Sequence, residues 1–107
     1  ARRDAVQRAE QAVWQAFDLL AHSQRISPEA PWLEVRTRLD EYALRVTFTY
    51  SGVALPAARA SAPTADALLD DPEAAAHLTA YLLSRLAKRV QVRQRDAIAQ
   101  LQLDFDA

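Results

Sequence analysis

The chain has 107 residues, 50% of them hydrophobic, and its 13 basic and 14 acidic residues give a net charge of −1. This length allows one domain with a single core, and the balanced charge gives no electrostatic reason to expect nucleic-acid binding. The absence of cysteine excludes disulfides, thiolate catalysis and cysteine-ligated zinc.

The chain begins with Ala, contains no Met, and has no run near the roughly 18 apolar residues that cross a bilayer. We therefore expect residues 1–107 to form one domain taken from a longer protein. The rest of such a protein can carry an activity of its own.

The first half of the chain predicts a helix followed by a hairpin. Apolar residues recur at three- and four-residue steps from Arg2 to about His22, which predicts an amphipathic helix. Its expected buried stripe is Val6, Ala9, Val13, Ala16, Phe17 and Leu20. Residues 32–39 and 43–50 alternate apolar and polar side chains around a polar turn. This pattern predicts a hairpin with one buried face and one solvated face.

The second half predicts a loop at 53–63, a short helical turn, a second helix and a second hairpin. Asp71 before Pro72 is typical of an N-cap followed by proline at the first helical position. The helix is expected to end near Lys88 or Arg89. Its expected buried stripe is Ala75, Leu78, Leu82 and Leu86. In the last strand, strict alternation buries Ala99, Leu101, Leu103 and Phe105.

The predicted order of elements, α-β-β-α-β-β, indicates an α+β fold. The economical arrangement is a two-layer α/β sandwich, in which both helices cover one face of a four-stranded, mainly antiparallel sheet.

The only glycine of the chain, Gly52, directly follows the second predicted strand in the segment TYSGVALP. The layout resembles the GHKL ATPase fold of histidine kinases and anti-sigma kinases, whose second strand ends in an Asp-x-Gly-x-Gly turn that reads adenine. Gly52 matches the first glycine, but Tyr50 replaces the Asp and Ala54 replaces the second glycine. Phosphate-binding loops need several glycines. The resemblance therefore implies a degenerate domain that does not hydrolyse ATP, and we expect it not to bind ATP.

The first helix also departs from the family pattern, in which a Glu and a magnesium-holding Asn are required. Alignment of His22 with the family's His puts Asp18 at the Asn and Trp14 at the Glu. A shift by one turn keeps Glu10 but puts Trp14 at the Asn. Neither alignment retains the pair.

At the second helix, His77 and Thr79 stand at the two glycines of the family's Gly-Leu-Gly-Leu start. The resemblance implies a vestigial nucleotide pocket with no catalytic residue, cofactor or metal. The residues expected to line it are Asp18, Tyr50, Gly52 and His77.

Residues 33–105 show a narrower resemblance, to the soluble C-terminal extension of bacterial xanthine/uracil permeases. It is carried by Asp-Glu-Tyr in the first turn, Tyr-x-Gly at the strand end, and Leu-Leu-Asp-Asp before the second helix. It implies a domain at the cytoplasmic face of the inner membrane, attached to a transporter.

Three hypotheses about function follow. The first is a non-catalytic accessory or regulatory domain of a nucleobase permease, which contacts the transporter's membrane domain or associates with itself. Its apolar surface candidates are Trp14, Val53 and Leu55. The second is a sensing module that binds a nucleobase in the vestigial pocket, with Tyr50 stacking on the base. The third, an active ATP-binding kinase or anti-sigma-type domain, is disfavoured by the single glycine and the missing Glu/Asn pair.

A cluster of basic residues lies near the end of the second helix. The basic cluster consists of Arg85, Lys88, Arg89, Arg93 and Arg95. Cations are favoured at helix C-termini, and below a bilayer they would also contact anionic headgroups. The two tryptophans, Trp14 and Trp32, are expected to pack in the core or between elements.

Overall fold

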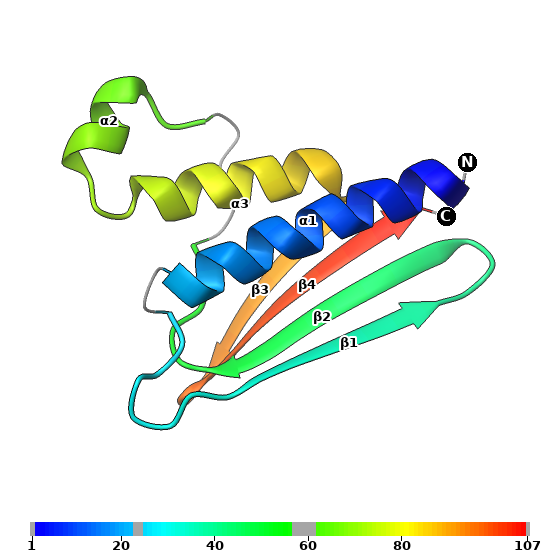
Figure 1. Cartoon of the computed structure of the whole chain (residues 1–107), viewed down its shortest axis with the longest axis horizontal. Helices are drawn as coiled ribbons and strands as arrows, with labels where there is room; N and C mark the ends of the chain where they lie inside the picture. The colour runs from blue at the N-terminus through cyan, green and yellow to red at the C-terminus, as the bar shows by residue number, and fades with distance from the viewer. Residues whose placement is uncertain (1, 23–24, 57–61, 107) are drawn as a thin grey trace.

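A computed structural model describes residues 2–22, 25–56 and 62–106. Its elements are α1 (Arg2–His22), β1 (Leu33–Leu39), β2 (Ala43–Ser51), α2 (Ala65–Asp70), α3 (Ala74–Leu86), β3 (Arg89–Arg95) and β4 (Ile98–Asp106). The strands form one antiparallel sheet in the order β1-β2-β4-β3. Helices α1 and α3 lie side by side on one face of this sheet (Figure 1). The expected two-layer α/β sandwich is confirmed.

The core lies between the helix layer and the two central strands, β2 and β4. Directly opposed residues of antiparallel strands point to the same face, so the register places the apolar residues of both strands together under the helices. The buried strand residues are Val46, Phe48, Tyr50, Ala99, Leu101, Leu103 and Phe105. The alternation of both strands therefore predicted their buried face correctly.

The buried face of α1 differs from the expected stripe. It consists mainly of alanine, with Ala9, Ala12, Ala16 and Leu20 buried. Val6 and Phe17 are exposed, because α3 flanks α1 on one side and no described helix flanks it on the other (Figure 1). The small side chains allow α1 to lie close to the sheet.

The buried face of α3 is rotated relative to the prediction. Ala74, Ala76, Ala80 and Leu83 are buried, whereas Ala75 and Leu82 are exposed. The reason is that α3 packs against both α1 and β3, so its centre of contact lies between the two. The N-cap is Glu73 rather than Asp71. Asp71 still accepts a hydrogen bond from the Glu73 N–H, at 2.9 Å, in the turn before the helix.

Strand β1 is an edge strand whose apolar face is largely uncovered. Leu33, Val35, Thr37 and Leu39 pair with the core-facing residues of β2 and share their face. Even so, Val35 is 45% exposed and Leu39 is 54% exposed. The expectation of a buried face holds for β2 but is wrong for most of β1, because α1 packs on β2 and β4.

Each hairpin turn uses an aspartate. Asp40 Oδ1 accepts hydrogen bonds from the N–H groups of Tyr42 and Ala43, both at 2.8 Å, and these bonds lower the pKa of Asp40. The second turn lies at Asp96 and Ala97. Asp96 adopts a positive φ of 53°, which Asp tolerates better than most residues.

Candidate functional site

Gly52 lies where two distant segments of backbone meet the end of β2. It forms an isolated bridge with Ile26, and its N–H donates to the Ala97 carbonyl at 2.8 Å. Its φ is +147°, and a Cβ at this position would overlap the Arg25 carbonyl oxygen. That oxygen accepts a hydrogen bond from the Val53 N–H at 2.8 Å. The glycine is therefore required for close backbone approach within the protein itself.

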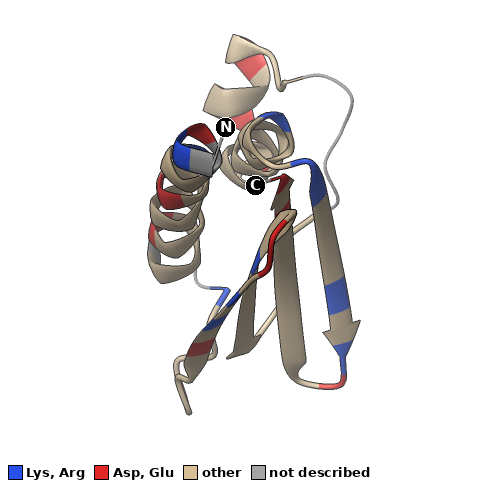
Figure 2. Cartoon of the chain, turned by 90° about the vertical axis from the view of Figure 1, so that its right-hand side faces the viewer, with Lys and Arg blue, Asp and Glu red and all other residues tan. Residues whose placement is uncertain are grey.

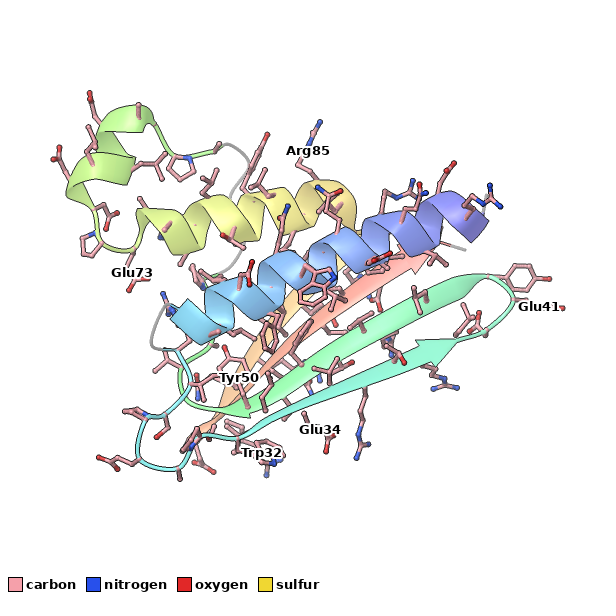
Figure 3. The ribbon with its side chains drawn as sticks, in the orientation of Figure 1. Trp32, Glu34, Glu41, Tyr50, Glu73 and Arg85 are labelled. Carbon is pink, nitrogen blue, oxygen red and sulfur yellow. The ribbon has the colours of Figure 1, made fainter. Side chains whose placement is uncertain are left out.

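Tyr50 is a core residue. Its exposed fraction is 0%, and its hydroxyl donates to the Val53 carbonyl at 2.7 Å. Burial raises the pKa of Tyr50 to about 12, an effect that the nearby Arg25 charge partly opposes. Figure 3 shows the residue between the sheet and the helices. In this position its ring contributes to packing and presents no open face for a ligand.

Two polar residues organise this junction, and no sequence motif marks either of them. Arg25 donates to the Ala54 carbonyl at 3.0 Å and forms an ion pair with Glu73, at the start of α3. Gln94 accepts from the Ala54 N–H at 2.7 Å and donates to the Gly52 carbonyl at 3.1 Å. Together they fasten the segment after β2 to α3 and β3.

The other two expected pocket residues line different hollows. Asp18 borders a shallow hollow of about 390 Å³ between α1 and α3, together with Thr79 and Leu82. His77 borders one of about 240 Å³ beside α2. The side chain of His22 lies outside the described part of the chain. A ligand held by Asp18, Tyr50, Gly52 and His77 together remains a prediction.

Charged residues surround a further hollow of about 480 Å³ at the end of the sheet that carries the turn between β1 and β2. Several of its charges are already paired. Arg45 contacts Asp104 at 2.8 Å and Lys88 contacts Asp106 at 3.2 Å. Within residues 2–22, 25–56 and 62–106, no group of three or more His, Cys, Asp and Glu residues could hold a metal ion.

Comparison of the chain with protein-family models, with curated proteins and with solved structures gives no match. None of the helices that the structure describes is long and apolar enough to cross a membrane.

One group of exposed apolar residues lies on α1 and β1. This α1–β1 apolar surface consists of Val6, Trp14, Phe17, Val35 and Leu39. Trp14 is 62% exposed and stacks edge-on against Phe17, with ring centroids 6.5 Å apart. By helix periodicity, Val6 and Phe17 lie on the flank of α1 opposite Gln15 and Leu19, which face α3. The two parts of the surface therefore border the same uncovered side of the sandwich.

The expected surface candidates are thus partly corrected. Trp14 and Val53 are exposed, but Leu55 is only 3% exposed and belongs to the core. The expected packing of Trp14 and Trp32 in the core or between elements is wrong, since Trp14 is 62% exposed and Trp32 is 46% exposed.

The sheet face opposite the helices, called here the open face, is rich in arginine. The register places six arginines on it: Arg36, Arg38, Arg45, Arg89, Arg93 and Arg95. Its acidic residues are Glu34, Asp104 and Asp106. Figure 2 shows basic residues along β3. Of the basic cluster, Arg85 is separate, because it lies on α3 and points away from the sheet (Figure 3).

Proposed function

We propose that the chain is a non-catalytic accessory domain that acts through protein–protein contact. The observation that carries this proposal is the α1–β1 apolar surface, which stays exposed although the core beneath α1 and α3 is complete. Clustered apolar exposure of this kind is typical of surfaces that bind another protein. The sequence resemblance supports a parent protein of the nucleobase permease class and a position at the cytoplasmic face of the inner membrane.

The junction around Gly52 supports the absence of a nucleotide-dependent role. A phosphate-binding turn presents free backbone N–H groups to its ligand. Here the N–H groups of Gly52, Val53 and Ala54 all donate to protein acceptors. Tyr50 is committed to the core as well. Nucleotide binding would require this junction to open.

Thermal unfolding with ATP, ADP, xanthine and uracil, each with magnesium, tests the proposal. We expect no stabilisation by any of them. A ligand present at 100 times its Kd would stabilise the fold by roughly 2.7 kcal/mol, which is about 4–8 °C for a domain of this size. A shift with ATP would overturn the proposal in favour of an active ATP-binding domain. A shift with a base alone would favour the sensing module.

We further propose that the open face contacts anionic lipid headgroups when the domain lies below a membrane. Its arginines outnumber its acidic residues, and juxtamembrane cations are attracted to anionic leaflets. The test is co-sedimentation with vesicles that contain phosphatidylserine. Binding should fall in the triple variant R89E/R93E/R95E and persist in the control R85E, because Arg85 lies on α3. Equal loss in both variants, or no binding by the unaltered chain, would contradict this contact.

A further inference from the structure

The free edge of β1 presents a defined set of backbone groups. The backbone N–H of Asp40 donates to the Ala43 carbonyl, and the Trp32 carbonyl accepts from the Ser51 N–H. The backbone groups of the even-numbered residues of β1 are therefore hydrogen-bonded to β2. In an antiparallel pair these residues alternate with residues whose N–H and C=O groups point the other way. The outward groups therefore belong to Leu33, Val35, Thr37 and Leu39. Unpaired groups of this kind are a template for a further strand.

The side chains of β1 select one way of pairing with a second β1. In a two-fold antiparallel pair centred on Val35, Glu34 lies opposite Arg36 of the other copy, and this pair occurs twice. Centring on Arg36 would place the two Arg36 side chains opposite each other. Centring on Thr37 would place Arg36 opposite Arg38, and centring on Glu34 would oppose two carboxylates. Like charges directly opposite are destabilising, and opposite charges are stabilising. Of these four registers, only the one centred on Val35 pairs opposite charges without opposing like charges.

We infer that two copies of the chain associate through β1 in the register centred on Val35, which joins their sheets into one eight-stranded antiparallel sheet. This inference deepens the proposed contact function, and rests on it, by naming the partner as a second copy. The two-fold axis is perpendicular to the sheet, so both helix layers lie on the same side of it. The uncovered flanks of the two α1 helices then face each other across the paired β1 strands. The α1–β1 apolar surfaces of both copies are thereby covered together.

The chain offers a direct test of the register because it contains no cysteine. In this register two Val35 residues form a hydrogen-bonded pair, with a Cα separation of about 5.5 Å that suits a disulfide. The variant Val35→Cys should form a cross-linked dimer rapidly under mild oxidation. The matched controls Arg36→Cys and Thr37→Cys are on the same exposed strand and report the registers centred on Arg36 and on Thr37. They should cross-link slowly. Equal or faster cross-linking of either control would overturn the inference.

Charge variants test the same register without cysteine. In Arg36→Glu, Glu34 of each copy lies opposite the introduced carboxylate of the other copy, on both sides of the two-fold axis. We expect dimerisation to weaken by roughly ten-fold or more. The double variant E34R/R36E exchanges the two charges and should restore association. Arg38→Glu is the control, because Arg38 faces Trp32 of the other copy rather than a charge. Sedimentation equilibrium measures all four proteins.

The outcomes separate this inference from the proposed function. A chain that stays monomeric at about 1 mM, together with a Val35→Cys variant that does not cross-link, would overturn self-association. Contact with a transporter's membrane domain would then remain as the proposed function. A stabilising nucleotide or nucleobase would instead overturn the contact function, whatever the result with Val35→Cys.

Discussion

The two edge strands of the sheet have the same length but opposite surroundings. β1 and β3 each contain seven residues, and each pairs with one central strand. On β3 the inward residues Val90 and Val92 are partly buried against the core, because α3 packs on that side. On β1 the inward residues Val35 and Leu39 are exposed. The inward face of β3 is therefore covered by α3, whereas the inward face of β1 remains exposed.

The charged residues of the two edge strands also differ: those of β3 disfavour pairing with a second copy, whereas those of β1 allow it. On its open face β3 carries only positive charges, at Arg89, Arg93 and Arg95. Pairing β3 with a second β3 would place arginines opposite arginine or glutamine, which protects this edge against self-association. β1 carries one acidic and two basic residues on that face, so it can complement itself. The comparison indicates that charged residues protect an edge strand against self-association only when their signs along the strand do not complement each other.

The largest expected effect concerns Gly52, which holds the chain segment leading into β1. Gly52→Ala introduces a Cβ that overlaps the Arg25 carbonyl oxygen, at a φ that L residues rarely adopt. We expect a loss of roughly 3–5 kcal/mol in the free energy of unfolding, measured by urea denaturation. Hydrogen exchange should show that the amides of β1 lose protection before those of β3, so that the two edge strands differ more in local stability than in the unaltered chain.

Asp96→Gly is the control for that substitution. Asp96 also has a positive φ, in the tight turn between β3 and β4, but there glycine is the more permissive residue. Its unfolding free energy should change by no more than about 1 kcal/mol. If Gly52→Ala were equally mild, close backbone approach would not be the reason for the glycine.

The second effect is a loss of stability at high pH through Tyr50, which pairs with Leu33 at the start of β1. The pKa of Tyr50 rises from 10.0 to about 12 because the residue is buried. The folded chain therefore holds this proton more tightly than the unfolded chain. Its contribution, roughly 2–3 kcal/mol, is complete below pH 10 and is lost as the pH rises through about 12.

Urea denaturation across this pH range measures the effect of Tyr50. Tyr50→Phe should flatten the decline in stability, at the cost of about 1 kcal/mol for the lost hydroxyl bond. The control Tyr42→Phe removes an exposed hydroxyl and should leave the decline in place. An unchanged decline in Tyr50→Phe would show that another group causes it.

A smaller effect separates the inward faces of the two edges directly. Val92→Ser on β3 replaces a side chain that packs on the core, and should cost roughly 1–2 kcal/mol of unfolding free energy. Val35→Ser occupies the equivalent middle position of β1 and should change it by at most about 0.5 kcal/mol when measured on monomer. Equal costs would mean that β1 is as well covered as β3.

The smallest expected effect comes from a substitution on β3 that lets this edge strand pair with a second copy of itself. Arg93→Glu would allow two β3 strands to pair about Gln91, with the introduced carboxylate of each copy opposite Arg89 of the other. Each such pair contributes roughly 0.2–1 kcal/mol, so we expect weak, salt-sensitive association beyond that of the unaltered chain. Sedimentation velocity at low and high salt measures it. Arg93→Gln is the control, since it removes the positive charge without adding a complement.

The sequence predicted the sandwich and the central strands because alternation at Val46, Phe48, Leu101 and Leu103 is uninterrupted. It did not predict which alternating strand would lie at an edge. The pattern of β1 is as regular as that of β2, and only the position of α1 decides that Val35 is exposed. For the same reason the helix stripes were misplaced: periodicity gives an apolar side of α1, but its neighbours determine how much of that side is covered.

The candidate site was less accessible to sequence reasoning. Gly52 was recognised as a position of special backbone geometry, but its partners, Arg25, Ile26 and Ala97, are distant in sequence and carry no motif. Tyr50 belongs to the same alternation as Phe48, and that periodicity was the better guide to its burial. Arg25 and Gln94 act through backbone carbonyls, which any sequence supplies, so no spacing marks them.

The exposed tryptophans give the protein an intrinsic optical reporter. Trp14 contacts Phe17, which lies on the flank of α1 that turns toward the second copy. Trp32 precedes β1 and lies opposite Arg38 of that copy in the register centred on Val35. Association removes both indoles from water, so their fluorescence should shift to shorter wavelength and resist acrylamide quenching as concentration rises. With Trp32→Phe, the remaining emission reports Trp14 alone. Assembly can thus be followed in the unlabelled chain.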